Sequence, residues 1–179
     1  MSDTARSAKK IAALAVMAAL LTGGKAALAA VFNVEVVSLF CALFGYVFGP
    51  VAMIPVCVFV LIEVLIWGIG YPSWVITYFI HFNLIVIVFW GLKRIRLRTP
   101  VVYVVVIAFM TFCFGVLEAV LNVLPVSVDL DNFFWRFGVY YGRGVAFCLV
   151  HIISNAIIFS LLFIPLKKLL SAIKEKMRI

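Results

Sequence analysis

Five ionisable side chains stand inside long apolar stretches of the sequence, and they are Lys25, Glu63, His81, Glu118 and Arg143. A charge within hydrocarbon is costly, so such groups face the interior of a bundle, pair with one another or line a cavity, and they mark a functional site by default. Three kinds of chemistry are open to them. These are ligand binding, structural ion pairs such as Lys25 with Glu63 and Arg143 with Glu118, and proton transfer by one of the two glutamates.

Aromatic, amide and imidazole side chains are expected at about the same level of the membrane. They include Trp67, Tyr71, Trp74, Tyr78, Phe79, Trp135, Tyr140 and Tyr141, together with Asn83, Asn122, His151 and Asn155. An aromatic belt at a membrane interface accounts for any one of the rings. As a set, these residues suit a ligand with a flat or apolar body and a few hydrogen-bonding groups. His151 and Asn155, four residues apart on one helix face, are either a ligand pair or part of an interhelical hydrogen bond.

The elements that position these residues must be membrane helices. The chain has 179 residues, of which 67% are hydrophobic and only 12% are charged, too few charges for the surface of a soluble domain. A cytosolic enzyme, a disordered tail and a secreted disulfide scaffold are excluded. Because about 20 apolar residues cross a bilayer, we predict one all-α membrane domain over residues 1–179 with six spans, at about 11–32, 35–48, 51–69, 74–92, 101–121 and 144–164. Residues 125–137 mix acids with aromatics and indicate an interfacial loop or a short amphipathic helix.

The net charge of +8 comes from 15 basic and 7 acidic residues, and the positions of the basic residues test this topology. Twelve of the 15 fall at the two ends of the chain and between the fourth and fifth spans: Arg6, Lys9, Lys10, Lys93, Arg94, Arg96, Arg98, Lys167, Lys168, Lys174, Lys176 and Arg178. Basic residues near short loops stay in the cytoplasm. We therefore expect both termini in the cytoplasm and the five ionisable residues in the outer half of the membrane. The N-terminal stretch also imitates a secretory signal peptide, but Lys25 in the cleavage region favours an uncleaved first helix.

Small residues recur along one face of the first predicted helix, at Ala8, Ala12, Ala15, Ala19, Gly23, Ala26 and Ala30. Such a stripe lets another helix approach closely in lipid. It is either an internal packing face or a docking face for a separate membrane subunit, with Ala15 and Ala19 at its centre. The four cysteines lack metal-ligand or CxxC spacing and are interpreted as packing residues. No phosphate loop, HExxH or GxSxG motif occurs, so we expect no cofactor, no metal and no ATPase or protease chemistry.

Several stretches resemble the substrate-binding S component of energy-coupling factor (ECF) vitamin transporters. They are the AxxxA element Ala15-Val-Met-Ala-Ala19, then Asn33-Val-Glu-Val-Val-Ser38, Gly45-Tyr-Val-Phe-Gly-Pro50, Val58 to Gly70 (VFVLIEVLIWGIG) and His151-Ile-Ile-Ser-Asn155. The resemblance covers most of the chain. It implies a compact bundle of six helices in a bacterial cell membrane.

The resemblance also implies a function. An S component captures a vitamin or related micronutrient outside the cell and topples in the membrane, while a transmembrane coupling subunit and two ATPases supply the energy. It is a transport subunit, not an enzyme, and it binds no nucleic acid. Docking of the coupling subunit is expected at Ala12, Ala15 and Ala19. Substrate contacts are expected at Glu63, Trp67, Tyr71, Trp74, Tyr78, His81, Glu118, Asn122, Tyr140 and Arg143. Cobalamin is the preferred substrate because the outer loop is aromatic and lightly charged, with riboflavin-like and pantothenate-like ligands as alternatives.

Two other functions compete with this interpretation. A stand-alone carrier would use Glu63 or Glu118 as a proton site and transport a small organic solute, although the six spans show no internal repeat of the kind common in such carriers. An intramembrane enzyme would need a nucleophile–base pair or a metal motif, and the sequence contains neither.

Overall fold

The computed structural model describes residues 3–70, 72–96 and 99–177, and every regular element within these ranges is helical. The helices are α1 (Asp3–Ala27), α2 (Val37–Phe48), α3 (Met53–Trp67), α4 (Pro72–Arg94), α5 (Pro100–Val123), α6 (Leu130–Ile158) and α7 (Ile164–Met177). Two 3₁₀ turns, η1 (Pro50–Ala52) and η2 (Leu124–Val126), follow α2 and α5, and the π-helical segment η3 (Phe159–Phe163) joins α6 to α7. The predicted all-α class is confirmed. Tyr71, Arg98 and Arg178 lie outside the described residues.

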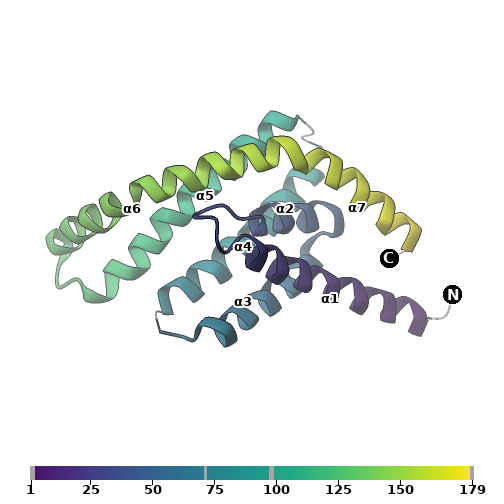
Figure 1. Cartoon of the computed structure of the whole chain (residues 1–179), viewed down its shortest axis with the longest axis horizontal. Coiled ribbons are helices and arrows are strands. Elements are labelled where there is room, and N and C mark those ends of the chain that lie inside the picture. Colours follow the sequence, from purple (N-terminus) through teal and green to yellow (C-terminus); the bar gives the residue numbers. More distant parts are fainter. Residues whose placement is uncertain (1–2, 71, 97–98, 178–179) are drawn as a thin grey trace.

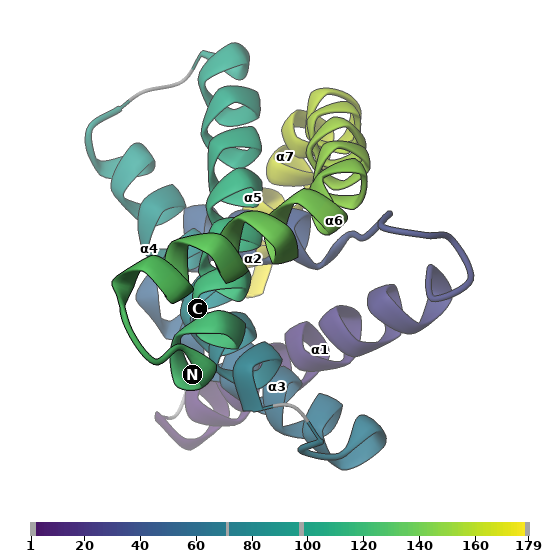
Figure 2. The ribbon, with the colours of Figure 1, turned by 90° about the vertical axis from the view of Figure 1, so that its left-hand side faces the viewer.

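Within the described ranges, five helical segments are long and apolar enough to cross a membrane: 7–27, 50–67, 72–94, 100–126 and 130–177. The first turn of α1 and the last turn of α7 lie at the same end of the molecule, on the right in Figure 1. The C-terminal ends of α3 and α5 and the first turns of α6 lie at the opposite end. Seen from that opposite end, α2 lies near the centre of the molecule, among the longer helices (Figure 2).

Helix α2 differs from the span predicted at 35–48. It has 12 residues, which at 1.5 Å per residue extend over only about 18 Å of the roughly 30 Å of hydrocarbon. Instead it is a core helix, buried on almost every side and packed against α1, α4 and α7. Gly45 permits its close approach to α4, because a Cβ atom there would lie 2.4 Å from the carbonyl oxygen of Val86. The helix ends at Gly49, whose φ of 83° favours glycine, and Pro50 follows.

Helix α6 also differs from the prediction. It begins at Leu130, not near Gly144, and takes up part of the stretch that was expected to form a loop or a short separate helix. Its start is fixed by Asp129, whose carboxylate accepts a hydrogen bond of 2.7 Å from the backbone N–H of Asn132. Through η3 the helix continues into α7, so that one helical segment covers residues 130–177. The first half of this segment, from Trp135 to His151, lines the cleft described next.

Candidate functional site

A cleft of about 690 Å³ lies between α5 and α6. The C-terminal end of α5 and the first turns of α6 lie at the end of the molecule opposite the termini (Figure 1). Residues three or four positions apart fall on one face of a helix, and one such face of each helix forms a wall. The α5 wall includes Thr111, Phe114, Gly115, Glu118 and Asn122, and the α6 wall includes Arg136, Tyr140, Arg143, Gly144, Phe147 and His151. The volume falls within the range of sites that bind small organic ligands.

The walls combine aromatic rings with charges of both signs. Glu118 contributes a carboxylate, and Arg136 and Arg143 contribute guanidinium groups. Among the described residues, Arg143 and Glu118 form no ion pair with each other, contrary to one of the two pairings considered from the sequence. Asn122 is already engaged: its amide donates to the carbonyl of Glu118 at 2.8 Å, and its oxygen accepts from Ser73 at 3.0 Å. Nε of Arg136 donates to the side-chain oxygen of Asn132 at 2.8 Å. Among the described residues, no ion pair engages Glu118, Arg136 or Arg143, so their charges are left to interact with a ligand.

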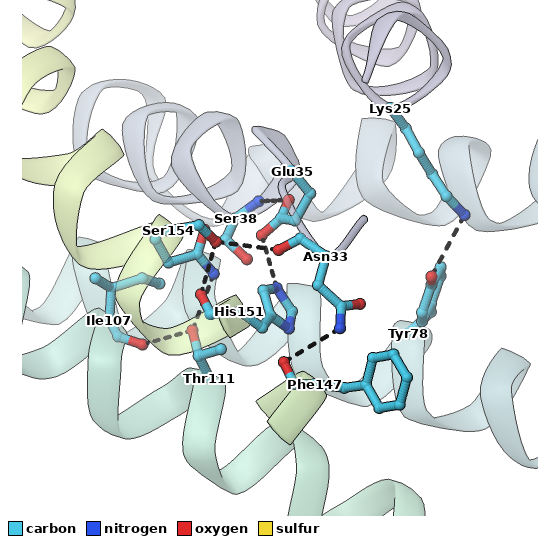
Figure 3. Close-up of polar contacts among 11 residues, drawn as sticks. Lys25, Asn33, Glu35, Ser38, Tyr78, Ile107, Thr111, Phe147, His151 and Ser154 are labelled. Atoms are coloured by element: carbon cyan, nitrogen blue, oxygen red, sulfur yellow. Dashed lines mark hydrogen bonds and ion pairs between the residues drawn. The ribbon is translucent and has the colours of Figure 1, made fainter. Parts of the chain in front are cut away.

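Polar contacts hold the connection between α1 and α2 against α6, as Figure 3 shows. Asn33 donates to the carbonyl oxygen of Phe147 at 3.2 Å, and its own carbonyl accepts from the hydroxyl of Ser154 at 3.0 Å. Glu35 lies 3.4 Å from Nε2 of His151. Asn33, Phe147 and His151 also line the cleft, so the connection is held against α6 by residues of the cleft itself.

Glu35 is the titratable group of this connection. Burial by itself would raise the pKa of its carboxyl group, but hydrogen bonding and charge attraction to His151, together with the 2.8 Å hydrogen bond from the backbone N–H of Ser38, lower the pKa to about 2. Glu35 is therefore ionised at neutral pH, and its contact with His151 joins the connection to α6.

Three of the predicted substrate residues form a separate cluster between α1, α3 and α4. Lys25 and Glu63 form an ion pair, in which the glutamate side chain is only 3% exposed. The ammonium group of Lys25 also lies 3.4 Å from the hydroxyl oxygen of Tyr78 and 4.6 Å from the centre of its ring. Trp74 packs edge-on against the same ring at 5.4 Å. This geometry matches the structural pairing of Lys25 with Glu63, and none of these four residues lines the cleft.

The other sequence candidates fall in different places. Trp67 is 69% exposed at the end of α3. His81 is 4% exposed and packs against Phe114, with ring centres 4.9 Å apart, so it lies behind a residue of the cleft wall. Asn155 donates to the hydroxyl of Thr111 at 3.0 Å, which is the interhelical hydrogen bond considered from the sequence. Of the ten predicted substrate residues, the cleft brings together Glu118, Asn122, Tyr140 and Arg143.

The small-residue stripe of α1 faces away from the other helices of the chain. Ala12, Ala15 and Ala19 are exposed, whereas Met17 and Leu21 on the other face are buried in the core. At Gly23 an added Cβ atom would meet no atom within 4 Å. Packing within this chain therefore does not account for the stripe.

The cleft also contains residues that the predicted substrate set omitted. They include Asn33, Phe114, Trp135, Arg136, Tyr141, Phe147 and His151. The α6 wall was not predicted, because the sixth span was expected to begin near residue 144. The sequence nevertheless shows helical spacing at Arg136, Tyr140, Arg143, Phe147 and His151. The Asp129 cap was the local signal for the earlier start. Asn33 carried no signal, because its place depends on the packing of a loop against a distant helix.

Comparison with known proteins found no match to the chain among protein-family models, curated proteins or solved structures. The fold and the cleft by themselves define the class: a helical protein whose long apolar helices suggest a multi-pass membrane protein, with one ligand-sized cleft between two of those helices.

Proposed function

We propose that this chain binds a small organic solute in the cleft between α5 and α6. The observation that carries the proposal is the cleft itself, with its volume of about 690 Å³ and its combination of aromatic and charged side chains. Mostly apolar walls with a few convergent polar groups are typical of small-molecule sites. Arg136 and Arg143 suit an anionic group of the solute, Glu118 suits a hydrogen-bond donor, and the rings of Trp135 and Tyr140 suit a flat or apolar body.

We further propose that the chain acts as the S component of an ECF importer in a bacterial cell membrane. The sequence resemblance supports this, and so does the outward-facing stripe on α1, which leaves Ala12, Ala15 and Ala19 accessible to a coupling subunit. In this proposal the end that carries both termini faces the cytoplasm, and the cleft opens to the outside of the cell. The core helix α2 takes the place of the second S-component helix without spanning the bilayer by itself. The ATPases of the complex supply the energy.

The volume of the cleft also bears on the substrate. About 690 Å³ suits a ligand of drug size. Cobalamin is considerably larger, so the cleft favours the riboflavin-like or pantothenate-like alternatives over the corrinoid preferred from the sequence.

Ligand retention tests the binding proposal. Gly144 lines the cleft and Gly142 does not, and a Cβ atom at either position meets nothing within 4 Å. Gly144→Phe should therefore fill the cleft without straining the helix, and Gly142→Phe is its matched control. Mass spectrometry of gently purified protein should find a small molecule with the wild type and the control but not with Gly144→Phe. If Gly144→Phe retains the molecule equally, the cleft is not its site.

Copurification tests the docking proposal. A coexpressed ECF coupling subunit should bind the wild type and should be lost from Ala15→Trp and Ala19→Trp, because bulky rings prevent close helix approach. Leu20→Trp is the control, since Leu20 is 41% exposed on α1 and lies neither three nor four positions from Ala12, Ala15 or Ala19. A complex that survives both alanine substitutions would contradict docking at this face. Solute uptake by liposomes that contain this chain alone, driven by a pH gradient and abolished by Glu118→Gln, would instead establish the carrier function.

A further inference from the structure

Three lysines converge at the end of the molecule that carries the termini. Lys93 of α4 and Lys174 of α7 both donate to the carbonyl oxygen of Val47, at 3.2 and 3.0 Å. Lys167 lies over the ring of Tyr46 at 5.0 Å, and Lys93 lies 5.8 Å from the centre of the same ring. The three ammonium groups are thus gathered around the last turn of α2.

Among the residues that the structure describes, this lysine cluster (Lys93, Lys167 and Lys174) has no acidic partner. Within the part of the chain that the structure describes, the ion pairs are Lys25 with Glu63 and His151 with Glu35, both of which lie elsewhere. Like charges held close together repel one another, and an anion bound between them relieves that repulsion. The cluster is therefore suited to a negatively charged group.

An apolar groove of about 230 Å³ adjoins the cluster. Its walls come from the first turns of α5 and from the π-helical segment η3, and they are Pro100, Val101, Tyr103, Val104, Phe159, Ser160, Phe163 and Ile164. The ammonium group of Lys167 lies 5.2 Å from the ring centre of Tyr103 and 5.9 Å from that of Phe163. The rings of Tyr103 and Phe163 therefore contact Lys167 and also line the groove. Val101 on its rim is 65% exposed, so the groove opens onto the outer surface of the bundle.

We propose that the lysine cluster and this groove together bind one anionic glycerophospholipid. Its phosphate lies among the three ammonium groups, and part of one acyl chain lies in the groove. Basic pockets between membrane helices are suited to anionic head groups, and an apolar groove beside the charges is suited to a chain. Inorganic phosphate would leave the groove empty, and a zwitterionic lipid would leave the lysine charges uncompensated. This site is separate from the α5–α6 cleft and does not depend on the function proposed for it.

Native mass spectrometry of the full chain in detergent tests the lipid site, with phosphatidylglycerol, phosphatidylcholine or inorganic phosphate added. The wild type should retain one phosphatidylglycerol more tightly than phosphatidylcholine. Lys167→Met keeps an apolar side chain against the rings but removes the charge, and it should weaken retention about fivefold, the factor that corresponds to about 1 kcal/mol per lysine. Lys168→Met is the matched control, because Lys168 is the exposed neighbour outside the cluster.

Val104→Trp tests the groove, since the indole should occupy the space of the acyl chain. It should reduce phosphatidylglycerol retention while the three lysines remain. Thermal unfolding without added lipid shows whether each variant is folded, and only folded variants are compared. Equal retention of the two lipids, unchanged retention in both Lys167→Met and Val104→Trp, or equal stabilisation by inorganic phosphate and by phosphatidylglycerol would each overturn the proposal.

Discussion

Replacement of Lys25 by methionine should strongly destabilise the fold, because it leaves the carboxylate of Glu63 buried without its partner. That carboxylate is 3% exposed and is paired with Lys25 in the structure. Removal of one member of a buried ion pair costs about 3–5 kcal/mol. For a chain of this size, 1 kcal/mol shifts the unfolding temperature by about 2–4 °C, so thermal unfolding in detergent should show a decrease on the order of 10 °C.

The double variant Lys25→Met with Glu63→Leu is the informative control. Replacement of both partners by apolar residues of similar volume is often neutral, so the double variant should regain most of the stability that the single variant loses. It should also keep the ligand of the α5–α6 cleft, because neither residue lines that cleft. The structural role of the Lys25–Glu63 ion pair is contradicted if Lys25→Met unfolds at the wild-type temperature. It is also contradicted if the double variant is no more stable than Lys25→Met alone.

Two further predictions concern α2 and the connection before it. Gly45→Ala should destabilise the protein by about 1–3 kcal/mol, because the added methyl group meets the backbone of α4. Gly91→Ala is the control and should not destabilise the protein, because a Cβ atom there meets nothing within 4 Å. Equal unfolding temperatures for the two variants would contradict the close contact between α2 and α4. Because the pKa of Glu35 is lowered from 4.5 to about 2 in the folded state, its stabilisation is complete above pH 4.5 and should fall by about 3 kcal/mol as the pH decreases toward 2. Unfolding measured across this range should show a smaller pH dependence in Glu35→Gln, and an unchanged slope would refute the contact with His151.

The sequence determined that the protein is built from apolar helices, because hydrophobic composition and run length fix what a bilayer can accommodate. It also indicated that Lys25 and Glu63 needed partners, since unpaired charges are not stable in an apolar interior. It misplaced the start of α6, because the aromatic stretch after Asp129 was interpreted by its composition and the cap was overlooked. With that cap, the periodic α6 wall of the cleft could have been predicted from Arg136 onward.

Only the tertiary structure decided which helix faces meet. Periodicity shows that Glu118 and Arg143 each belong to a face, but not that these two faces enclose one cleft while Glu63 is paired in another cluster. The same applies to α2, whose apolar sequence suits a spanning helix or a core helix, and which the packing of α1, α4 and α7 makes a core helix. Local sequence sets the geometry and the polarity of each helix. The pairing of distant helices depends on packing across the whole chain, for which no short stretch carries a signal.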